Sequence, residues 1–99
     1  MAYTIEFADS VKPHLEALTP KQRATVLAKI EGQLTNQPLV ETRNRKPLRP
    51  NPVAPWELRV GQLRVFYDVS EAPPATVRIL AVGVKERNVV RIGGEEIQL

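Results

Sequence analysis

Hydrophobic and polar residues alternate over two short runs that meet at Gly61 and Gln62. Glycine at the first position of a two-residue connection favours a type II′ turn, because glycine enters the positive-φ region without steric cost. The alternation therefore predicts a β-hairpin over residues 56–69, with apolar pairs on one face and a polar row on the other. The expected cross-strand pairs are Trp56 with Tyr67, Leu58 with Val65, Arg59 with Arg64, and Val60 with Leu63.

The predicted register places two like charges, Arg59 and Arg64, directly opposite each other, which destabilises a hairpin. Two interpretations are open. Glu57 and Asp68 point to the same face and can neutralise the arginines by diagonal contacts. Alternatively, this face binds phosphate, for which a pair of guanidinium groups is well shaped. Tyr67 belongs to the apolar face, so we expect it to be packed rather than catalytic.

The N-terminal part of the chain predicts a strand and a first helix. Residues 3–7 alternate as in a half-buried strand, with one face formed by Tyr3, Ile5 and Phe7. Ser10 can cap the helix, and Pro13 falls in its first turn, where the missing N–H costs little. The expected buried stripe is formed by Val11, Leu15 and Leu18. His14 lies beside that stripe and is expected to be a partly exposed structural residue.

A second helix is expected to begin after Thr19. Thr19 is the N-cap, Pro20 occupies the first helical position and Gln22 completes a capping box. Its expected buried stripe is formed by Ala24, Leu27, Ile30 and Leu34. The two helices therefore form a hairpin that is broken at residues 19–20.

Residues 38–55 are rich in proline and in basic residues, a composition that neither a helix nor a central strand tolerates. We expect an extended, basic loop, and loops of this length in small domains are usually functional or mobile. The loop is either a solvated connector or a source of phosphate contacts. Phosphate contact is preferred because the cations lead into the arginine-bearing hairpin. These cations are Arg43, Arg45, Lys46 and Arg49.

The C-terminal part predicts further strands. Residues 76–84 form the most apolar run and predict a central strand, which Lys85 and Arg87 follow. Residues 89–92 and 95–99, separated by two glycines, predict a short terminal hairpin. The element order is strand, helix, helix, strand, strand, strand. The simplest architecture is α+β: an antiparallel sheet of about four strands with the helical hairpin packed on one face.

Composition narrows the possible functions. Ninety-nine residues with 42% hydrophobic content predict one domain, residues 1–99, with a single core. The chain has no cysteine and one histidine, so we expect no disulfide, metal site or cofactor. There is no apolar run of membrane-spanning length and no secretion signal, so we expect a cytoplasmic protein without a membrane partner. The net charge of +3 favours an acidic partner, such as nucleic acid or an acidic protein.

The element order and several short motifs resemble the RelE/ParE superfamily of toxins from type II toxin–antitoxin systems. The resemblance spans nearly the whole chain and is carried by PLR (residues 47–49), WELR (56–59), LRVFYDV (63–69) and AVGVKER (81–87). For the RelE branch it implies a toxin that enters the ribosomal decoding site and cleaves messenger RNA without a metal. It also implies that a cognate antitoxin holds the toxin inactive.

The resemblance assigns roles to individual positions. Arg59 matches a basic position on the first hairpin strand, and Arg64 matches the arginine on the second. Lys85 falls where the family commonly has an arginine, with Arg87 close by. Two positions depart from the pattern. Glu57 stands where the ribosome-dependent nuclease has a lysine, and Arg91 stands near the position of its catalytic tyrosine.

Cleavage by the 2′-hydroxyl of the RNA needs a base, an acid and cations that stabilise the charge developing on phosphate. Arg59, Arg64 and Lys85 can supply the cations. Glu57 is the candidate base, although it can equally serve as an ion-pair partner of an arginine. The acid would be Lys85 or Arg87. Further candidate RNA contacts are Arg43, Arg45, Lys46, Arg49, Arg87 and Arg91.

Two other functions are compatible with the same resemblance. A non-enzymatic toxin of the ParE type would bind and poison DNA gyrase, and the missing lysine and tyrosine favour that alternative. The chain could also be an inactive toxin-like module whose only partner is its antitoxin. The preferred function is an mRNA-cleaving endoribonuclease that acts on translated mRNA on the ribosome.

Overall fold

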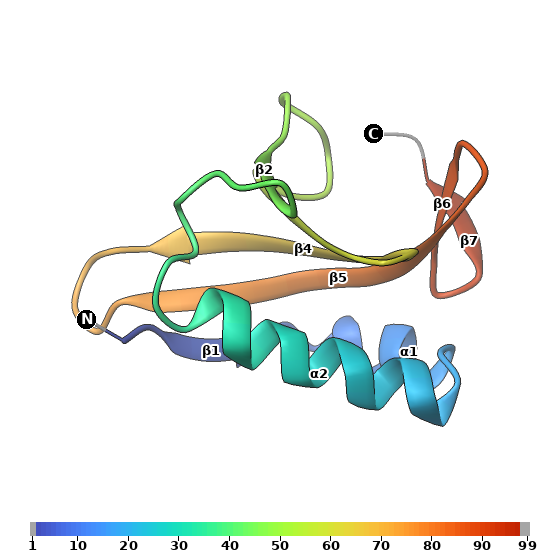
Figure 1. The fold of residues 1–99 in the computed structure, drawn as a ribbon, viewed down its shortest axis with the longest axis horizontal. Coiled ribbons are helices and arrows are strands. Elements are labelled where there is room, and N and C mark those ends of the chain that lie inside the picture. The colour runs from blue at the N-terminus through green and yellow to red at the C-terminus, as the bar shows by residue number, and fades with distance from the viewer. Residues whose placement is uncertain (1, 98–99) are drawn as a thin grey trace.

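The computed structural model describes residues 2–97. In this part of the chain, two helices lie against one face of a twisted, seven-stranded sheet, and the loop after β2 and the C-terminal hairpin rise from the other face (Figure 1). The elements in chain order are β1 (Thr4–Phe7), α1 (Val11–Glu16), α2 (Pro20–Leu34), β2 (Arg45–Pro47), β3 (Trp56–Val60), β4 (Leu63–Ser70), β5 (Thr76–Glu86), β6 (Val89–Ile92) and β7 (Glu95–Ile97).

The predicted α+β class is confirmed. The strands follow the order β2-β3-β4-β5-β6-β7 and pair antiparallel, while β1 pairs with β5 in parallel. The four expected strands correspond to β1, β3, β4 and β5, and β2, β6 and β7 are three further short strands. The terminal hairpin was predicted over residues 89–99, and its second strand is described as far as Ile97. Gln98 and Leu99 lie outside the described residues.

The loop prediction for residues 38–55 needs one correction, because residues 45–47 form β2. This strand pairs with β3 alone and ends at Pro47. Proline is compatible with a sheet edge, where its missing N–H breaks no ladder hydrogen bond. The prolines therefore exclude this segment from the centre of the sheet but not from its edge.

The hairpin of β3 and β4 forms in the predicted register. Trp56 pairs with Tyr67, Leu58 with Val65, Arg59 with Arg64, and Val60 with Leu63. Gly61 has φ of 60°, which the expected type II′ turn requires at its first position. The rings of Trp56 and Tyr67 stack with their centroids 6.1 Å apart. Local alternation and one glycine were therefore sufficient to fix this register.

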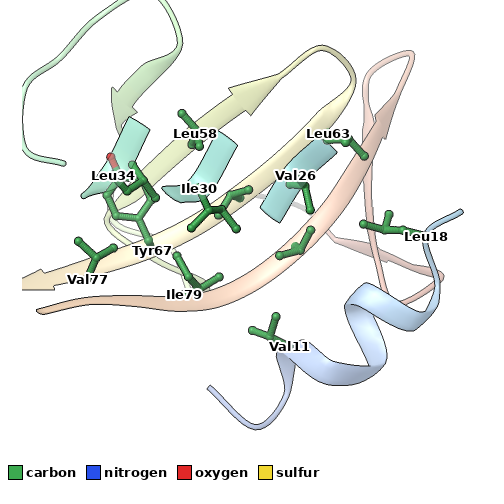
Figure 2. Packing of buried hydrophobic residues seen from close by; sticks show 12 residues of the cluster. Val11, Leu18, Val26, Ile30, Leu34, Leu58, Leu63, Tyr67, Val77 and Ile79 are labelled. Carbon is green, nitrogen blue, oxygen red and sulfur yellow. The ribbon is translucent and has the colours of Figure 1, made fainter. Parts of the chain in front are cut away.

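Helix α2 begins as predicted, and its buried stripe is confirmed at Ile30 and Leu34 but not in its first half. The Thr19 hydroxyl oxygen accepts a hydrogen bond from the backbone N–H of Gln22, and the Gln22 side-chain oxygen accepts one from the backbone N–H of Thr19, which completes the capping box. The residues facing the sheet are Val26, Ile30 and Leu34, as Figure 2 shows. Leu27, expected in the stripe, is 37% exposed, and Ala24 is exposed as well. In this half of the helix Val26 is buried instead, and Arg23 turns inward and donates to the carbonyls of Leu15 and Leu18.

Helix α1 covers a gap along the edge of β5. Along that edge β5 pairs with β1 at residues 76–79 and with β6 at residues 83–86. Between them, the Ser10 hydroxyl donates to the Leu80 carbonyl, and the Val82 N–H donates to Nδ1 of His14. Ser10 therefore bonds the sheet rather than capping α1 with its side chain. Burial lowers the pKa of the His14 imidazole from its ordinary 6.5, consistent with a neutral acceptor.

The burial expected of Val11, Leu15 and Leu18 is confirmed, since Val11 and Leu18 are buried and Leu15 packs against the core, but α1 ends at Glu16 and Leu18 follows it in the connection to α2. Val11 and Leu18 join the residues of α2 and the apolar residues of β3, β4 and β5 in one core between helices and sheet (Figure 2). Neither helix in the described part of the chain combines the length and apolar character needed to cross a membrane.

Candidate functional site

The face of the sheet away from the helices carries the predicted cations. Leu58, Leu63 and Val65 pack into the helix-side core, so the residues between them point to the opposite face. Arg59 and Arg64 are therefore neighbours on that face, as the sequence predicted. Lys85 lies on the same face, because it is two residues from Gly83 on β5 and Gly83 is the cross-strand partner of Arg64.

A second apolar cluster partly covers this face and frames the cations. It comprises Ala54, Phe66, Ala81, Val90 and Ile92. The loop of residues 48–55 supplies one side of the cluster, and β6 supplies the other. Asn51 holds the loop closed, since its side chain accepts from the N–H groups of Val53 and Ala54 and donates to the Ala54 carbonyl. The cation-bearing face thus lies between an ordered loop and the C-terminal hairpin (Figure 1).

Glu57 connects the two arginines. Its Oε2 lies 3.4 Å from Nε of Arg59, and its Oε1 lies 3.3 Å from Nε of Arg64. The Glu57 side chain is only 8% exposed. One carboxylate therefore separates the like charges, which is the first of the two interpretations that the sequence left open. Asp68, its expected companion, is exposed and accepts a hydrogen bond from the backbone of Val69.

The two arginines differ in their surroundings. The Arg64 side chain is 10% exposed, and its Nη1 donates to the carbonyls of Gly61 and Leu63 at 2.7 and 2.9 Å. Burial lowers the pKa of the Arg64 guanidinium, the charge of Glu57 raises it, and the charge of Arg59 lowers it. The Arg59 side chain is 45% exposed and meets Glu57 through Nε. Arg64 is therefore bonded to the hairpin turn, whereas Arg59 presents its guanidinium to solvent.

A hollow of about 480 Å³ lies beside Arg59. Its apolar wall includes Val89 and Ile97, and its polar wall is formed by Glu57, Arg59, Lys85, Asn88 and Glu96. The turn between β5 and β6 borders this hollow, and its first residue, Arg87, is exposed and has φ of 58°. This backbone conformation is uncommon for a residue other than glycine, and such residues are enriched at functional sites. The hollow thus joins two cations and a carboxylate from β3 and β5 with a second carboxylate, Glu96, from β7.

Two of the predicted loop cations lie on opposite faces of β2. Arg45 is buried on the helix side and donates from Nη1 to the Gln33 carbonyl at the end of α2, 2.7 Å away. Lys46, the next residue, pairs across the strands with Glu57 and therefore lies on the cation-bearing face. Its Nζ is 3.4 Å from Oε2 of Glu41. The structure brings Lys46, but not Arg45, to the side of the hollow.

The remaining predicted contacts are dispersed. Arg43 is exposed between α2 and β2, and Arg49 lies in a separate hollow of the 48–55 loop together with Asp68. Arg91 pairs with Val84, which faces the helices, and its Nε is 3.9 Å from Glu86. Arg91 therefore lies on the opposite sheet face from Arg59 and Lys85. The structure does not bring these three arginines together with the hollow.

Tyr67 is packed, as expected, and its hydroxyl donates to the Pro38 carbonyl 2.7 Å away. Burial raises the pKa of the Tyr67 phenol. Sequence reasoning did not select five polar residues that line the hollow beside Arg59 or a smaller one between α2 and β3 that also includes Arg59, namely Lys29, Gln33, Asn44, Asn88 and Glu96. Lys29 and Gln33 come from α2, and Asn44 comes from the segment before β2. No local pattern in the sequence indicates that these segments approach β3.

Comparison with known proteins relates this chain to a solved toxin–antitoxin structure. No protein-family model matches the sequence, and no curated protein sequence matches it. A chain in the crystal structure of the toxin–antitoxin complex RelBE2 from Mycobacterium tuberculosis matches this fold with a TM-score of 0.73 and 30% sequence identity. The match covers 86% of this chain and 93% of the other. The fold and the similarity in sequence show that the chain belongs to the RelE/ParE superfamily of toxins.

Proposed function

We propose that this protein is the toxin of a type II toxin–antitoxin pair and acts in the cytoplasm as an endoribonuclease on ribosome-bound mRNA. The observation that supports the proposal is the hollow in which Arg59 and Lys85 stand beside the carboxylate of Glu57. Two cations at one hollow provide an electrostatic site for a phosphodiester, and the neighbouring carboxylate provides a proton acceptor.

In the proposed reaction, the ribose 2′-oxygen attacks the adjacent phosphorus, and the bond from phosphorus to the 5′-oxygen breaks. Glu57 accepts the proton of the 2′-hydroxyl. Arg59 and Lys85 stabilise the negative charge that develops on the phosphate oxygens. The departing 5′-oxygen receives a proton from Lys85 or Arg87, directly or through water. The products are a 2′,3′-cyclic phosphate and a free 5′-hydroxyl.

One observation favours the second candidate, a toxin of the ParE type that binds DNA gyrase without catalysis. Each oxygen of Glu57 lies close to a guanidinium group. Both oxygens are therefore already engaged by cations, which leaves neither free to accept a proton from a ribose hydroxyl. A surface that only binds would need the cations of the hollow but no free proton acceptor.

An antitoxin is the proposed protein partner. The solved relative is a toxin–antitoxin complex. The described surface of this chain carries large apolar residues that are at least one-third exposed, and these are Phe7, Leu27, Leu39 and Val40. Exposed apolar residues of this kind are available for burial against a second protein. The proposed partner therefore covers apolar surface as well as cations.

Expression of the chain in cells that lack its antitoxin tests the choice between the candidates. A nuclease produces new mRNA 5′ ends within translated codons, whereas a gyrase poison induces the DNA damage response. The variant Glu57→Gln keeps the side-chain shape but removes the proton acceptor, so it should abolish the mRNA ends. Glu16→Gln is the matched control because Glu16 is exposed on α1. mRNA ends that persist unchanged in Glu57→Gln would contradict the assigned base.

A further inference from the structure

Arg59, a cation of the hollow, is connected to the hairpin turn through two buried side chains. Within the described residues, the Arg59 side chain makes one hydrogen bond, in which Nε donates to Oε2 of Glu57 at 3.4 Å. The second carboxylate oxygen, Oε1, lies 3.3 Å from Nε of Arg64. Arg64 in turn donates from Nη1 to the carbonyls of Gly61 and Leu63, at 2.7 and 2.9 Å. The connection therefore runs from backbone carbonyls to Arg64, then to Glu57 and then to Arg59.

Burial decreases along this connection, so its inner part is fixed and its outer end is accessible. The side chains of Glu57 and Arg64 are 8% and 10% exposed, whereas that of Arg59 is 45% exposed. Arg59 lines the hollow, and Arg64 does not. A guanidinium held at Nε keeps its planar pair of Nη groups free for a bidentate contact with phosphate oxygens. An anion in the hollow can therefore contact Arg59 directly, whereas Arg64 acts on that anion only through Glu57.

A hairpin needs no buried charges at these positions for its stability. Arg59 and Arg64 are cross-strand partners of like charge, an arrangement that destabilises a sheet. Burial lowers the pKa of the Arg64 guanidinium, so its charged form is costly there. Buried ionic groups can often be replaced together by apolar residues of similar volume without loss of stability. The chain thus carries, at a cost in stability, a set of charges whose arrangement orients Arg59.

We propose that Arg64 is a positioning residue, which acts through Glu57 to fix the guanidinium of Arg59 for phosphate binding. This inference rests on the proposed function, in which Arg59 holds a phosphate of the RNA, and it extends the site to a residue that lies outside the hollow. A guanidinium that is already fixed loses less conformational freedom on binding than a mobile one, so it binds phosphate more tightly. Glu57 has this holding role whether or not it also accepts a proton.

The test replaces Arg64 by lysine, which keeps the charge but lacks the planar group that bonds the turn and Glu57 together. Arg78→Lys is the matched control, because Arg78 also forms an ion pair with a carboxylate but does not line the hollow. The probe is a single-stranded DNA hexamer, and its binding is measured by fluorescence anisotropy. Arg64→Lys should weaken binding about tenfold, the effect of losing one charge-assisted hydrogen bond. Arg78→Lys should bind as tightly as the unmodified protein.

A double-mutant cycle distinguishes positioning from a role in stability alone. If Arg64 acts on the ligand through Arg59, Arg64→Lys should weaken binding in the unmodified protein but not in a protein that already carries Arg59→Met. A role of Arg64 in stability alone would weaken binding equally in both backgrounds, and that result would overturn the inference.

The Nε–H resonance of Arg59, identified by its loss in Arg59→Met, gives a readout in the free protein. We expect exchange of this proton with water to be slow in the unmodified protein and faster in Arg64→Lys, because the lysine no longer fixes Glu57. Equal exchange rates in the two proteins would also overturn the inference.

Failure of this inference is distinguishable from failure of the proposed function, because the DNA hexamer has no 2′-hydroxyl and cannot undergo the proposed reaction. If the hexamer binds with the expected dependence on Arg64 but RNA is not cleaved, the positioning role stands and the nuclease function fails. If the unmodified protein does not bind the hexamer, or Arg64→Lys binds it equally well, the positioning role is wrong even where RNA is cleaved.

Discussion

The two arginines that face each other across the β3–β4 hairpin should respond in opposite ways to the same substitution. Arg64 is almost buried and donates to two turn carbonyls, whereas Arg59 is nearly half exposed and lines both hollows. Arg64→Met should therefore destabilise the fold, and Arg59→Met should impair function in a protein of nearly unchanged stability. The prediction separates a structural from a functional arginine within one cross-strand pair.

The geometry sets the expected magnitudes. Each hydrogen bond from a charged donor contributes about 1.5 kcal/mol, so loss of the two bonds from Nη1 of Arg64 costs about 3 kcal/mol before the ion pair with Glu57 is counted. For a domain of this size, that loss lowers Tm by about 12–24 °C. Arg59 has an ion pair at an exposed site, which contributes about 1 kcal/mol or less. The free energies of unfolding of the two variants should thus differ by at least about 2 kcal/mol.

Urea unfolding followed by the fluorescence of Trp56 measures this difference. Trp56 is the single tryptophan, and it stacks on the buried ring of Tyr67, so its emission reports the packing of the hairpin. Arg64→Lys keeps the charge without the planar guanidinium group, so its free energy of unfolding should fall between those of the parent and Arg64→Met. An equal loss of stability in Arg59→Met and Arg64→Met would refute the reasoning, because it would mean that burial does not distinguish the two sites.

Three further substitutions test the fold around the site. A Cβ at Gly83 would lie 2.5 Å from a backbone oxygen of β6, so Gly83→Ala should cost about 1–3 kcal/mol and speed hydrogen exchange of the β6 amides. Tyr67→Phe leaves the Pro38 carbonyl without its donor and should cost about 1–3 kcal/mol in urea unfolding. The pKa of His14 is lower in the folded chain than its ordinary 6.5, so the unfolded chain binds the proton more tightly. The contribution of the neutral imidazole to stability is therefore complete above pH 6.5, and it declines as the pH falls through the folded-state pKa. His14→Asn keeps an acceptor that does not titrate, so its free energy of unfolding should lose that part of the pH dependence.

The sequence predicted those features that depend on neighbours along the chain. The hairpin register follows from alternation and from Gly61, and the start of α2 follows from Thr19, Pro20 and Gln22, all within a few residues of each other. The shared face of Arg59 and Arg64 follows from the same alternation. These predictions needed no knowledge of what packs on either side of the sheet.

The features that the sequence did not predict depend on contacts between distant segments. The choice of Val26 rather than Leu27 for the core depends on how α2 crosses the sheet, and Arg23 can turn inward because the carbonyls of Leu15 and Leu18, in and just after the last turn of α1, lie within its reach. The opposite placement of Arg45 and Lys46 depends on the register of β2 against β3. A run of basic residues in the sequence therefore divides between the core and the site, and composition cannot indicate how.

The role of Glu57 shows why the two interpretations of the arginine pair are compatible. Arg59 and Arg64 repel each other in the hairpin, and the carboxylate between them offsets that repulsion. Glu57 and Glu96, the second carboxylate of the hollow, together cancel two of the three positive charges formed by the two arginines and Lys85, so the group keeps one net positive charge. A phosphodiester carries a single negative charge and can bind to this remainder without displacing the carboxylate. Neutralisation by Glu57 thus stabilises the empty site, and the uncancelled charge remains available for an anionic ligand.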